Sequence, residues 1–111
     1  MSFRIIPTRR FEKELKRLVK KFPSLKTEYA ELIENISQDP ETGTFIGKKC
    51  YKIRLAISSK GRGKSGGARV ITYLYTGMET VYLLTIYDKG ERADLKPNEL
   101  KEMIYSLELD T

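Results

Sequence analysis

A strand-like segment that runs directly into a glycine-rich loop is the most constraining feature of this sequence. From Tyr51 to Leu55, apolar residues alternate with Lys52 and Arg54, which is the two-residue period of a strand with one buried face. The loop that follows, up to Arg69, contains four glycines, which permit positive φ and bring backbone N–H groups close to a bound anion. We therefore expect a cationic strand face that leads into a phosphate-binding loop.

Positive charge is concentrated in this part of the chain. No acidic residue occurs between Glu41 and Glu79, whereas eight cations fall in that interval. They are Lys48, Lys49, Lys52, Arg54, Lys60, Arg62, Lys64 and Arg69. Together with a net charge of +6, this concentration predicts an acidic partner, which is nucleic acid, an acidic protein segment or an anionic membrane.

Other features of the composition narrow the possible partners and the possible kinds of catalysis. No apolar run approaches the roughly 20 residues that a membrane-spanning helix needs, and the N-terminus lacks the apolar core of a secretory signal. We therefore expect a cytoplasmic protein with no membrane partner. Cys50 is the single cysteine and there is no histidine, which rules out an internal disulfide and histidine-dependent nucleophilic catalysis. We expect neither a metal ion nor a cofactor.

Hydrophobic periodicity predicts a helical hairpin after a short first strand. The strand is expected around Phe3–Ile5 and ends before Pro7. Two amphipathic helices follow on either side of Pro23, with apolar residues at helical spacing through residues 11–22 and 25–36. We expect both apolar stripes to pack onto a sheet, and we prefer this explanation to binding of a membrane or of a peptide.

The second half of the chain predicts most of the sheet. Residues 41–47 are interpreted as a loop, and strands are expected at Tyr51–Leu55, Ala68–Tyr75 and Val81–Tyr87. Leu100–Leu107 predicts a short helix after Pro97. The expected fold is a single α+β domain over residues 1–111, in the order β-α-α-β-β-β-α. Its N-terminal strand and helical hairpin would pack on a mostly antiparallel four-stranded sheet.

The cations are expected to meet at the ends of neighbouring strands. Arg54, Arg69 and Lys89 lie on or beside three strand ends, and the loop cations Lys60, Arg62 and Lys64 join two of these strands. Tyrosines nearby, among them Tyr87, supply aromatic faces on which bases of single-stranded RNA stack. The residues therefore favour RNA binding or RNA cleavage. For each lysine taken alone, the alternative is an ordinary solvent-exposed side chain with no role in binding.

RNA cleavage without a metal requires an activated 2′-hydroxyl, stabilisation of the phosphorane charge and protonation of the leaving oxygen. A lysine among other cations has a lowered pKa and is suited to act as the base. Arg69 is better suited to hold the phosphate and stabilise the transition state. Removal of one such donor costs about 3–4 kcal/mol in comparable sites.

Three blocks of sequence resemble the HigB-type toxins of the RelE/ParE superfamily. They are KIRLA at 52–56, SKGRGKSGGARVI at 59–71 and LLTIYDKGE at 83–91, the last followed by Asp94 and Leu95. The resemblance covers about residues 50 to 104. It implies a small RelE-like fold and the toxin of a type II toxin–antitoxin system. Such a toxin cleaves mRNA in the ribosome and is held inactive by a cognate antitoxin.

The resemblance also implies roles for individual residues. Catalysis falls on five residues, which are Arg54, Lys60, Arg69, Tyr87 and Lys89. Binding of RNA phosphates falls on Lys52, Arg62, Lys64 and Arg92. RelE enzymes have an arginine and a tyrosine in their C-terminal segment, whereas the corresponding residues 90–96 here lack the tyrosine and offer only Arg92 for the arginine.

Two other functions remain compatible with these residues. ParE members of the same superfamily inhibit gyrase, although a protein-binding toxin would not need the concentrated cations of residues 60–69. A noncatalytic RNA-binding module is the second alternative. Sequence-specific DNA binding by the free chain is not expected, because no helix carries the pattern of a recognition helix.

Overall fold

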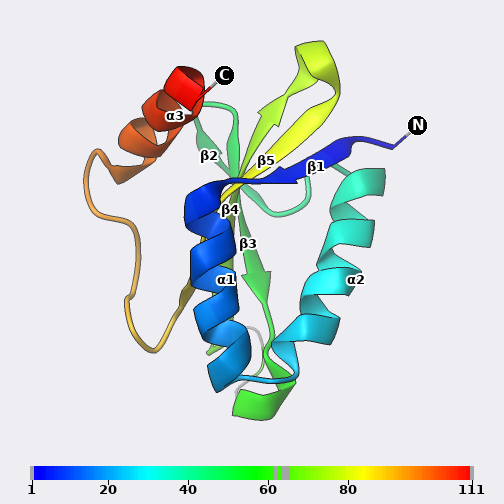
Figure 1. Cartoon of the computed structure of the whole chain (residues 1–111), viewed down its shortest axis with the longest axis vertical. Coiled ribbons are helices and arrows are strands. Elements are labelled where there is room, and N and C mark those ends of the chain that lie inside the picture. Colours follow the sequence, from blue (N-terminus) through cyan, green and yellow to red (C-terminus); the bar gives the residue numbers. More distant parts are fainter. Residues whose placement is uncertain (1, 62, 64–65, 111) are drawn as a thin grey trace.

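One mixed sheet, in the order β1-β5-β4-β3-β2, runs through the molecule (Figure 1). Its strands are β1 (Arg4–Pro7), β2 (Thr44–Gly47), β3 (Cys50–Leu55), β4 (Ala68–Tyr75) and β5 (Thr80–Asp88). β1 pairs with β5 in parallel, and every other pairing is antiparallel. The computed structural model describes residues 2–61, 63 and 66–110, without the side chains of residues 108–110.

The helices are α1 (Arg9–Lys21), α2 (Leu25–Gln38) and α3 (Glu99–Asp110). Thr8 determines where α1 begins, because its Oγ1 accepts a hydrogen bond from the Phe11 amide at 3.2 Å. The same hydroxyl donates to the Leu83 carbonyl at 3.0 Å, so the cap also fixes the start of α1 against β5. In the described part of the chain, no helix is both long and apolar enough to cross a membrane.

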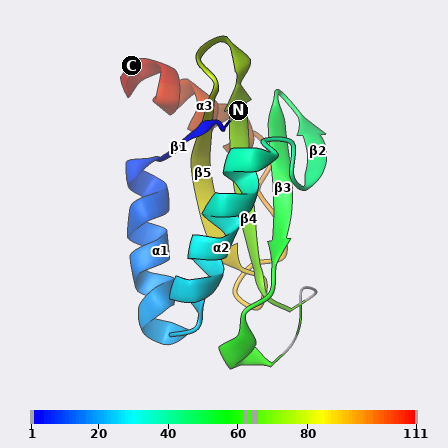
Figure 2. The same ribbon diagram turned by 90° about the vertical axis from the view of Figure 1, so that its right-hand side faces the viewer.

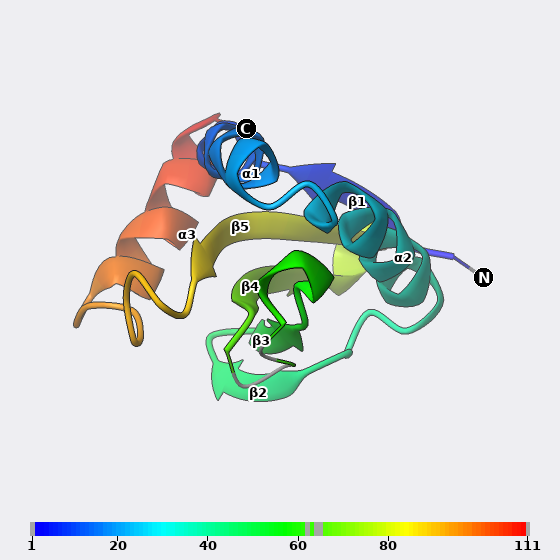
Figure 3. The ribbon, with the colours of Figure 1, turned by 90° about the horizontal axis from the view of Figure 1, so that it is seen from below.

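The helical hairpin covers one face of the sheet. Figures 2 and 3 show α1 and α2 lying along the same side of the strands. Phe11 and Leu18 of α1 and Ile36 of α2 are fully buried there against strand residues such as Val70 and Leu83. Each such side chain contributes about 1.5–3 kcal/mol on burial, so this interface accounts for much of the stability of the fold. The predicted packing of both apolar stripes onto the sheet is confirmed.

A second, smaller cluster fills the opposite face. It contains Cys50, Ile71, Leu84 and Tyr87 from three strands and Met103 from α3. Because both faces are covered, β5 is buried along almost its whole length, as the consecutive apolar residues of this strand predict. The segment between β5 and α3 also runs over this second face, and this face carries the candidate site.

The observed sheet differs from the expected one at β1 and β2. β1 was expected to end before Pro7, but it includes Pro7, which pairs with Leu83. Residues 41–47 were expected to form a loop, but Thr44–Gly47 forms β2, which pairs with β3 and adds a fifth strand to the sheet. β2 and β3 are joined by Lys48 and Lys49, both at positive φ (53° and 62°). A tight hairpin turn needs positive φ at both central residues, and lysine is an uncommon choice there, so the usual glycine or asparagine signal is missing.

Candidate phosphate-binding and catalytic site

The strand register aligns three of the predicted site residues. Arg54 of β3 lies directly opposite Arg69 of β4, which in turn lies opposite Tyr87 of β5. Directly opposed residues of antiparallel strands point to the same face, here the face away from the helical hairpin. Two arginines opposite each other repel, so this pairing disfavours folding and is typical of a binding site for an anion.

Arg69 and Tyr87 are buried, whereas Arg54 is exposed. Arg69 is 5% exposed and donates through Nη1 to the carbonyl oxygen of Ala68 at 3.1 Å. Tyr87 is 4% exposed, and its hydroxyl has no hydrogen-bond partner within the described residues. Burial raises the pKa of Tyr87, the nearby Asp94 carboxylate raises it further, and Arg92 and Arg69 oppose the rise. Tyr87 is therefore protonated at neutral pH and can donate a proton.

The segment of residues 89–98, which we call the strap, joins β5 to α3, contains the predicted residues Lys89 and Arg92, and contacts Lys52. Lys52 donates to Asp94 Oδ1 at 2.8 Å, and Lys89 donates to the Ala93 carbonyl at 2.8 Å. Arg92 lies over the Tyr87 ring, with its Cζ 5.1 Å from the ring centroid. Lys52, Lys89 and Arg92 thus lie on the same side of the sheet as Arg69 and Tyr87.

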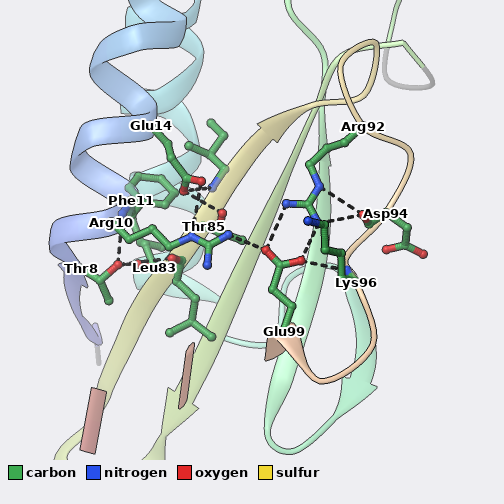
Figure 4. A network of polar contacts seen from close by, with 12 residues as sticks. Thr8, Arg10, Phe11, Glu14, Leu83, Thr85, Arg92, Asp94, Lys96 and Glu99 are labelled. Atoms are coloured by element: carbon green, nitrogen blue, oxygen red, sulfur yellow. Dashed lines mark hydrogen bonds and ion pairs between the residues drawn. The ribbon is translucent and has the colours of Figure 1, made fainter. Parts of the chain in front are cut away.

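A chain of ion pairs holds Arg92 in this position (Figure 4). Glu99 at the start of α3 accepts from Arg92 Nη1 at 3.0 Å and from Arg10 Nη2 at 2.6 Å. Arg10 also approaches Glu14 of α1, with Nε to Oε2 at 3.4 Å. The hydrogen bond from Arg92 is the main cause of a strong fall in the pKa of Glu99, to about 2. These contacts tie α1, the strap and α3 together.

Glu14 extends the same network to the edge of β5. Its Oε1 accepts from Thr85 Oγ1 at 2.7 Å and from the Ile86 amide at 3.3 Å (Figure 4). β1 pairs with β5 only as far as Leu83, so a side chain of α1 replaces the missing strand beyond that point. The edge of β5 next to Tyr87 is therefore held in place by a carboxylate.

Lys60 does not join this group. Its ammonium forms an ion pair with Asp88, and the side chains of the pair are only 10% and 4% exposed. Lys60 Nζ also lies 5.3 Å from the ring centroid of Phe22, which belongs to the hairpin side of the sheet. The structure therefore separates Lys60 from Arg54 and Arg69. Arg62 and Lys64, the other predicted loop cations, lie outside the described residues.

Gly67 brings the end of the loop into position for this alignment. A Cβ atom at Gly67 would lie 2.1 Å from the carbonyl oxygen of Leu55, a backbone atom that cannot move aside. The close approach lets β4 begin at Ala68 opposite the end of β3, so that Arg69 meets Arg54 in register. Here the glycine is needed for space, and no positive φ is involved.

A groove of about 640 Å³ lies beside Arg54, between α2 and the part of β3 that β2 does not cover. Glu28 and Glu31 of α2 line it together with Arg54, so carboxylates outnumber cations in this groove. Cys50 is buried, which raises its thiol pKa to about 12 and makes it unreactive at neutral pH. Among the described residues, no group of three histidine, cysteine, aspartate or glutamate side chains is arranged to hold a metal ion.

Comparison with protein families decides the class of this protein. The family model described as the RelE toxin of the RelE/RelB toxin–antitoxin system matches residues 3–106. The chain belongs to the RelE toxin family. It is therefore a toxin of a type II toxin–antitoxin system, and the resemblance noted in the sequence is confirmed at the level of the RelE family.

Solved RelE structures share the fold. A mutant of E. coli toxin RelE in the free state, with two arginines replaced by alanine, has a TM-score of 0.61 at 16% identity over 84% of this chain and 90% of that one. The toxin–antitoxin complex RelBE2 from Mycobacterium tuberculosis gives 0.56 at 16% identity over 85% and 95%. The isolated E. coli RelE toxin gives 0.52 at 17% identity over 96% and 99%. The predicted α+β RelE-like fold is confirmed.

Three residues of this site had no clear signal in the sequence. Glu99 and Arg10 hold Arg92, and Asp94 pairs with Lys52, but these residues had been assigned no role. Glu99 lies at the start of the C-terminal helix, and its side chain is only 12% exposed. Period-based analysis assigns a side chain to a face and cannot identify a partner far away in the chain.

Proposed function

We propose that this RelE-family toxin cleaves mRNA on the ribosome, and that the face carrying Arg54, Arg69 and Tyr87 performs the cleavage. The alignment of these three residues across β3, β4 and β5 is the observation that supports the proposal. It gathers two permanent cations and one protonated hydroxyl at one end of the sheet. RelE family membership supports the same activity, and we further propose that the chain is a HigB-type member.

The reaction follows from the chemistry of RNA. The 2′-oxygen of the substrate attacks the adjacent phosphorus, the bond to the 5′-oxygen breaks, and a 2′,3′-cyclic phosphate and a 5′-hydroxyl are formed. Arg69, with Arg54 beside it, binds the phosphate oxygens and stabilises the charge that develops on them. Tyr87 donates its proton to the leaving 5′-oxygen, consistent with its raised pKa.

A lysine of the same face is the remaining candidate for the base that takes the 2′-proton. We propose Lys89 for this role, because it follows directly after the end of β5, two residues from Tyr87. Arginine is a poor base and Tyr87 is protonated, so neither of them can take this role. Lys52 and Arg92 are proposed to bind flanking phosphates of the mRNA.

Partners follow from the same proposal. The ribosome would present the mRNA, and a cognate antitoxin would bind the toxin and keep it inactive. The M. tuberculosis structure of similar fold is itself a toxin–antitoxin complex, which supports an antitoxin partner for this chain. A basic site favours an antitoxin segment of acidic character.

Mapping of mRNA ends during cell-free translation tests the activity. The purified toxin is added to a translation reaction, and primer extension locates new 5′ ends with and without ribosomes. We expect new ends inside the reading frame only when ribosomes are present. Inhibition of translation without new ends would contradict cleavage, and inhibition of gyrase supercoiling in a parallel assay would then support a ParE-like activity.

A further inference from the structure

The strap supplies one carboxylate and two backbone carbonyl oxygens to the cations beside the candidate site. Lys52 contacts the Asp94 carboxylate, and Lys89 contacts the Ala93 carbonyl. Arg92 donates through Nε and Nη2 to the Asp94 carbonyl at 3.1 and 2.9 Å. Each of these side chains is therefore already bound to an oxygen of the strap, and in the proposed complex each would bind an oxygen of RNA.

The Tyr87 hydroxyl beneath the strap lies near the Asp94 carboxylate but makes no hydrogen bond of normal geometry with it. Its ring is covered by Arg92, and its oxygen is buried with no hydrogen bond among the described residues. A buried hydroxyl without a partner costs about 1–3 kcal/mol, so it is expected to bond to a group that enters the site. Asp94 is the carboxylate that raises the pKa of Tyr87 most strongly, so it lies close to the Tyr87 hydroxyl. An anion that took the place of the Asp94 carboxylate would therefore lie within reach of both Lys52 and Tyr87.

The contact between Asp94 and Lys52 is easily replaced. The Asp94 side chain is 63% exposed, and ion pairs this accessible contribute at most about 1 kcal/mol. The anchor at the C-terminal end of the strap is stronger, because Glu99 binds Arg92 and Arg10 together. Asp94 can thus leave Lys52 while α3 and Glu99 stay in place.

These observations lead to an inference that rests on the proposed function and adds a regulated binding position to it. We propose that the Asp94 carboxylate occupies the position of a backbone phosphate of RNA, and that binding of RNA displaces Asp94 from Lys52. The ligand of this position is a phosphodiester group next to the scissile one, held by Lys52 and close to the Tyr87 hydroxyl. In the free toxin the strap competes with RNA for this position.

Binding of an RNA that cannot be cleaved tests the inference without ribosomes. The probe is a fluorescein-labelled, fully 2′-O-methylated RNA hexanucleotide, and its affinity is measured by fluorescence anisotropy in 50 mM and 150 mM KCl. Asp94→Asn is the first variant, because its side-chain oxygen can still accept the hydrogen bond from the Leu95 amide. We expect this variant to bind the RNA about fivefold tighter than the wild type, as loss of a competitor worth about 1 kcal/mol predicts.

Glu91→Gln is the matched control. It removes the same charge from the same strap, but Glu91 pairs with Arg17 of α1 at 2.8 Å, on the hairpin side of the sheet. Its affinity for RNA should stay within about twofold of the wild type, since a remote exposed charge is largely screened. Lys52→Met should weaken binding and abolish the gain from Asp94→Asn in the double variant.

Several results would overturn the inference. An equal gain in Asp94→Asn and Glu91→Gln would mean that net charge alone controls binding. Weaker binding by Asp94→Asn would mean that Asp94 helps to hold RNA. If thermal unfolding shows that the asparagine variant is not folded, Asp94→Ser is measured in its place with the same expectation. Absence of binding by every variant would contradict competition by the strap, while ribosome-dependent cleavage would still be decided by the mapping of mRNA ends.

Discussion

Arg69 and Tyr87 lie directly opposite each other on β4 and β5, and both side chains are almost completely buried. A buried hydroxyl with no hydrogen bond among the described residues costs stability, and a protein core gains nothing from it. The pair therefore indicates a site that is prepared for a ligand. At such a site a substitution can lower the activity without lowering the stability of the fold, and Tyr87 is the clearest case.

Tyr87→Phe is expected to impair activity without impairing the fold. The hydroxyl has no hydrogen bond to lose in the described structure, and the ring that Arg92 covers is retained. The free energy of unfolding, measured in urea, should therefore stay the same or rise by up to about 1 kcal/mol. Ribosome-dependent cleavage should fall by about 10²–10⁴-fold, the usual contribution of a general acid. Full activity in a stable variant would exclude Tyr87 as the proton donor.

Lys60 is expected to matter for stability through Asp88. Removal of one member of a buried ion pair leaves the other uncompensated, so Lys60→Met should destabilise the protein by about 3 kcal/mol. Lys60→Met combined with Asp88→Asn should lose less than the sum of the single variants, because no buried charge is left without a partner. Urea unfolding of the four proteins gives the coupling.

The same double variant tests where Lys60 acts. The structure places the Lys60 ammonium on the hairpin side of the sheet, away from Arg54 and Arg69. We therefore expect the folded double variant to retain ribosome-dependent cleavage within about tenfold of the wild type, which is below the contribution of a direct acid or base. A loss as large as that of an Arg69 variant would mean that Lys60 moves into the site when mRNA binds.

Gly67→Ala is expected to disturb the register between β3 and β4. The new methyl group would meet the carbonyl oxygen of Leu55, so the strands must separate locally, at a cost of about 1–3 kcal/mol. Gly90→Ala is the control, since its Cβ would make only ordinary contacts at 3.4 Å with Asp88 and Lys60. Thermal unfolding and cleavage are measured for both variants. Equal effects of the two substitutions would contradict a special role for Gly67.

Glu99 predicts a defined dependence of stability on pH. Its folded pKa of about 2 lies below the usual 4.5, chiefly because Arg92 donates to it. The stability that this interaction contributes is therefore complete above about pH 4.5 and is lost as the pH falls toward 2. Glu99→Gln should be less stable than the wild type at pH 7, and the difference should vanish near pH 2. A difference in unfolding free energy that does not change with pH would contradict this assignment.

The sequence was sufficient to predict most elements of the fold. The helices were found because their apolar residues recur at helical spacing, and Pro23 indicates where the first of them ends. β3, β4 and β5 were found from alternation and β-branched residues. β2 was missed because four residues with a glycine at the end carry no usable period, and because the hairpin turn is made by two lysines. The parallel pairing of β1 with β5 depends on packing far from either strand in sequence.

The sequence was sufficient to predict on which face of a strand a site residue lies, but not which residues lie next to it. Alternation places Lys52 and Arg54 on one face of β3, but only the strand register sets Arg54 opposite Arg69 and Arg69 opposite Tyr87. Partners across the chain were not predictable: Lys60 was expected near the arginines, and Asp88 holds it elsewhere. Asp94 and Glu99 were also missed, since nothing in a charge pattern shows which cation a carboxylate pairs with.

The rate of mRNA cleavage by Arg69→Ala on purified ribosomes tests the central claim most directly. A defined mRNA is bound to ribosomes, an excess of toxin is added, and the single-turnover rate is measured for wild type, Arg69→Ala and Arg4→Ala. Arg4 is an exposed arginine of β1, which pairs with the opposite end of β5, so its loss controls for charge. Urea unfolding first establishes that each protein is folded.

Arg69→Ala should cleave at least about a hundredfold more slowly than the wild type, as expected when a donor to the transition state is removed, and Arg4→Ala should stay close to the wild-type rate. A folded Arg69→Ala protein that cleaves at the wild-type rate would contradict the account, because the aligned face of Arg54, Arg69 and Tyr87 could then not be the site of cleavage.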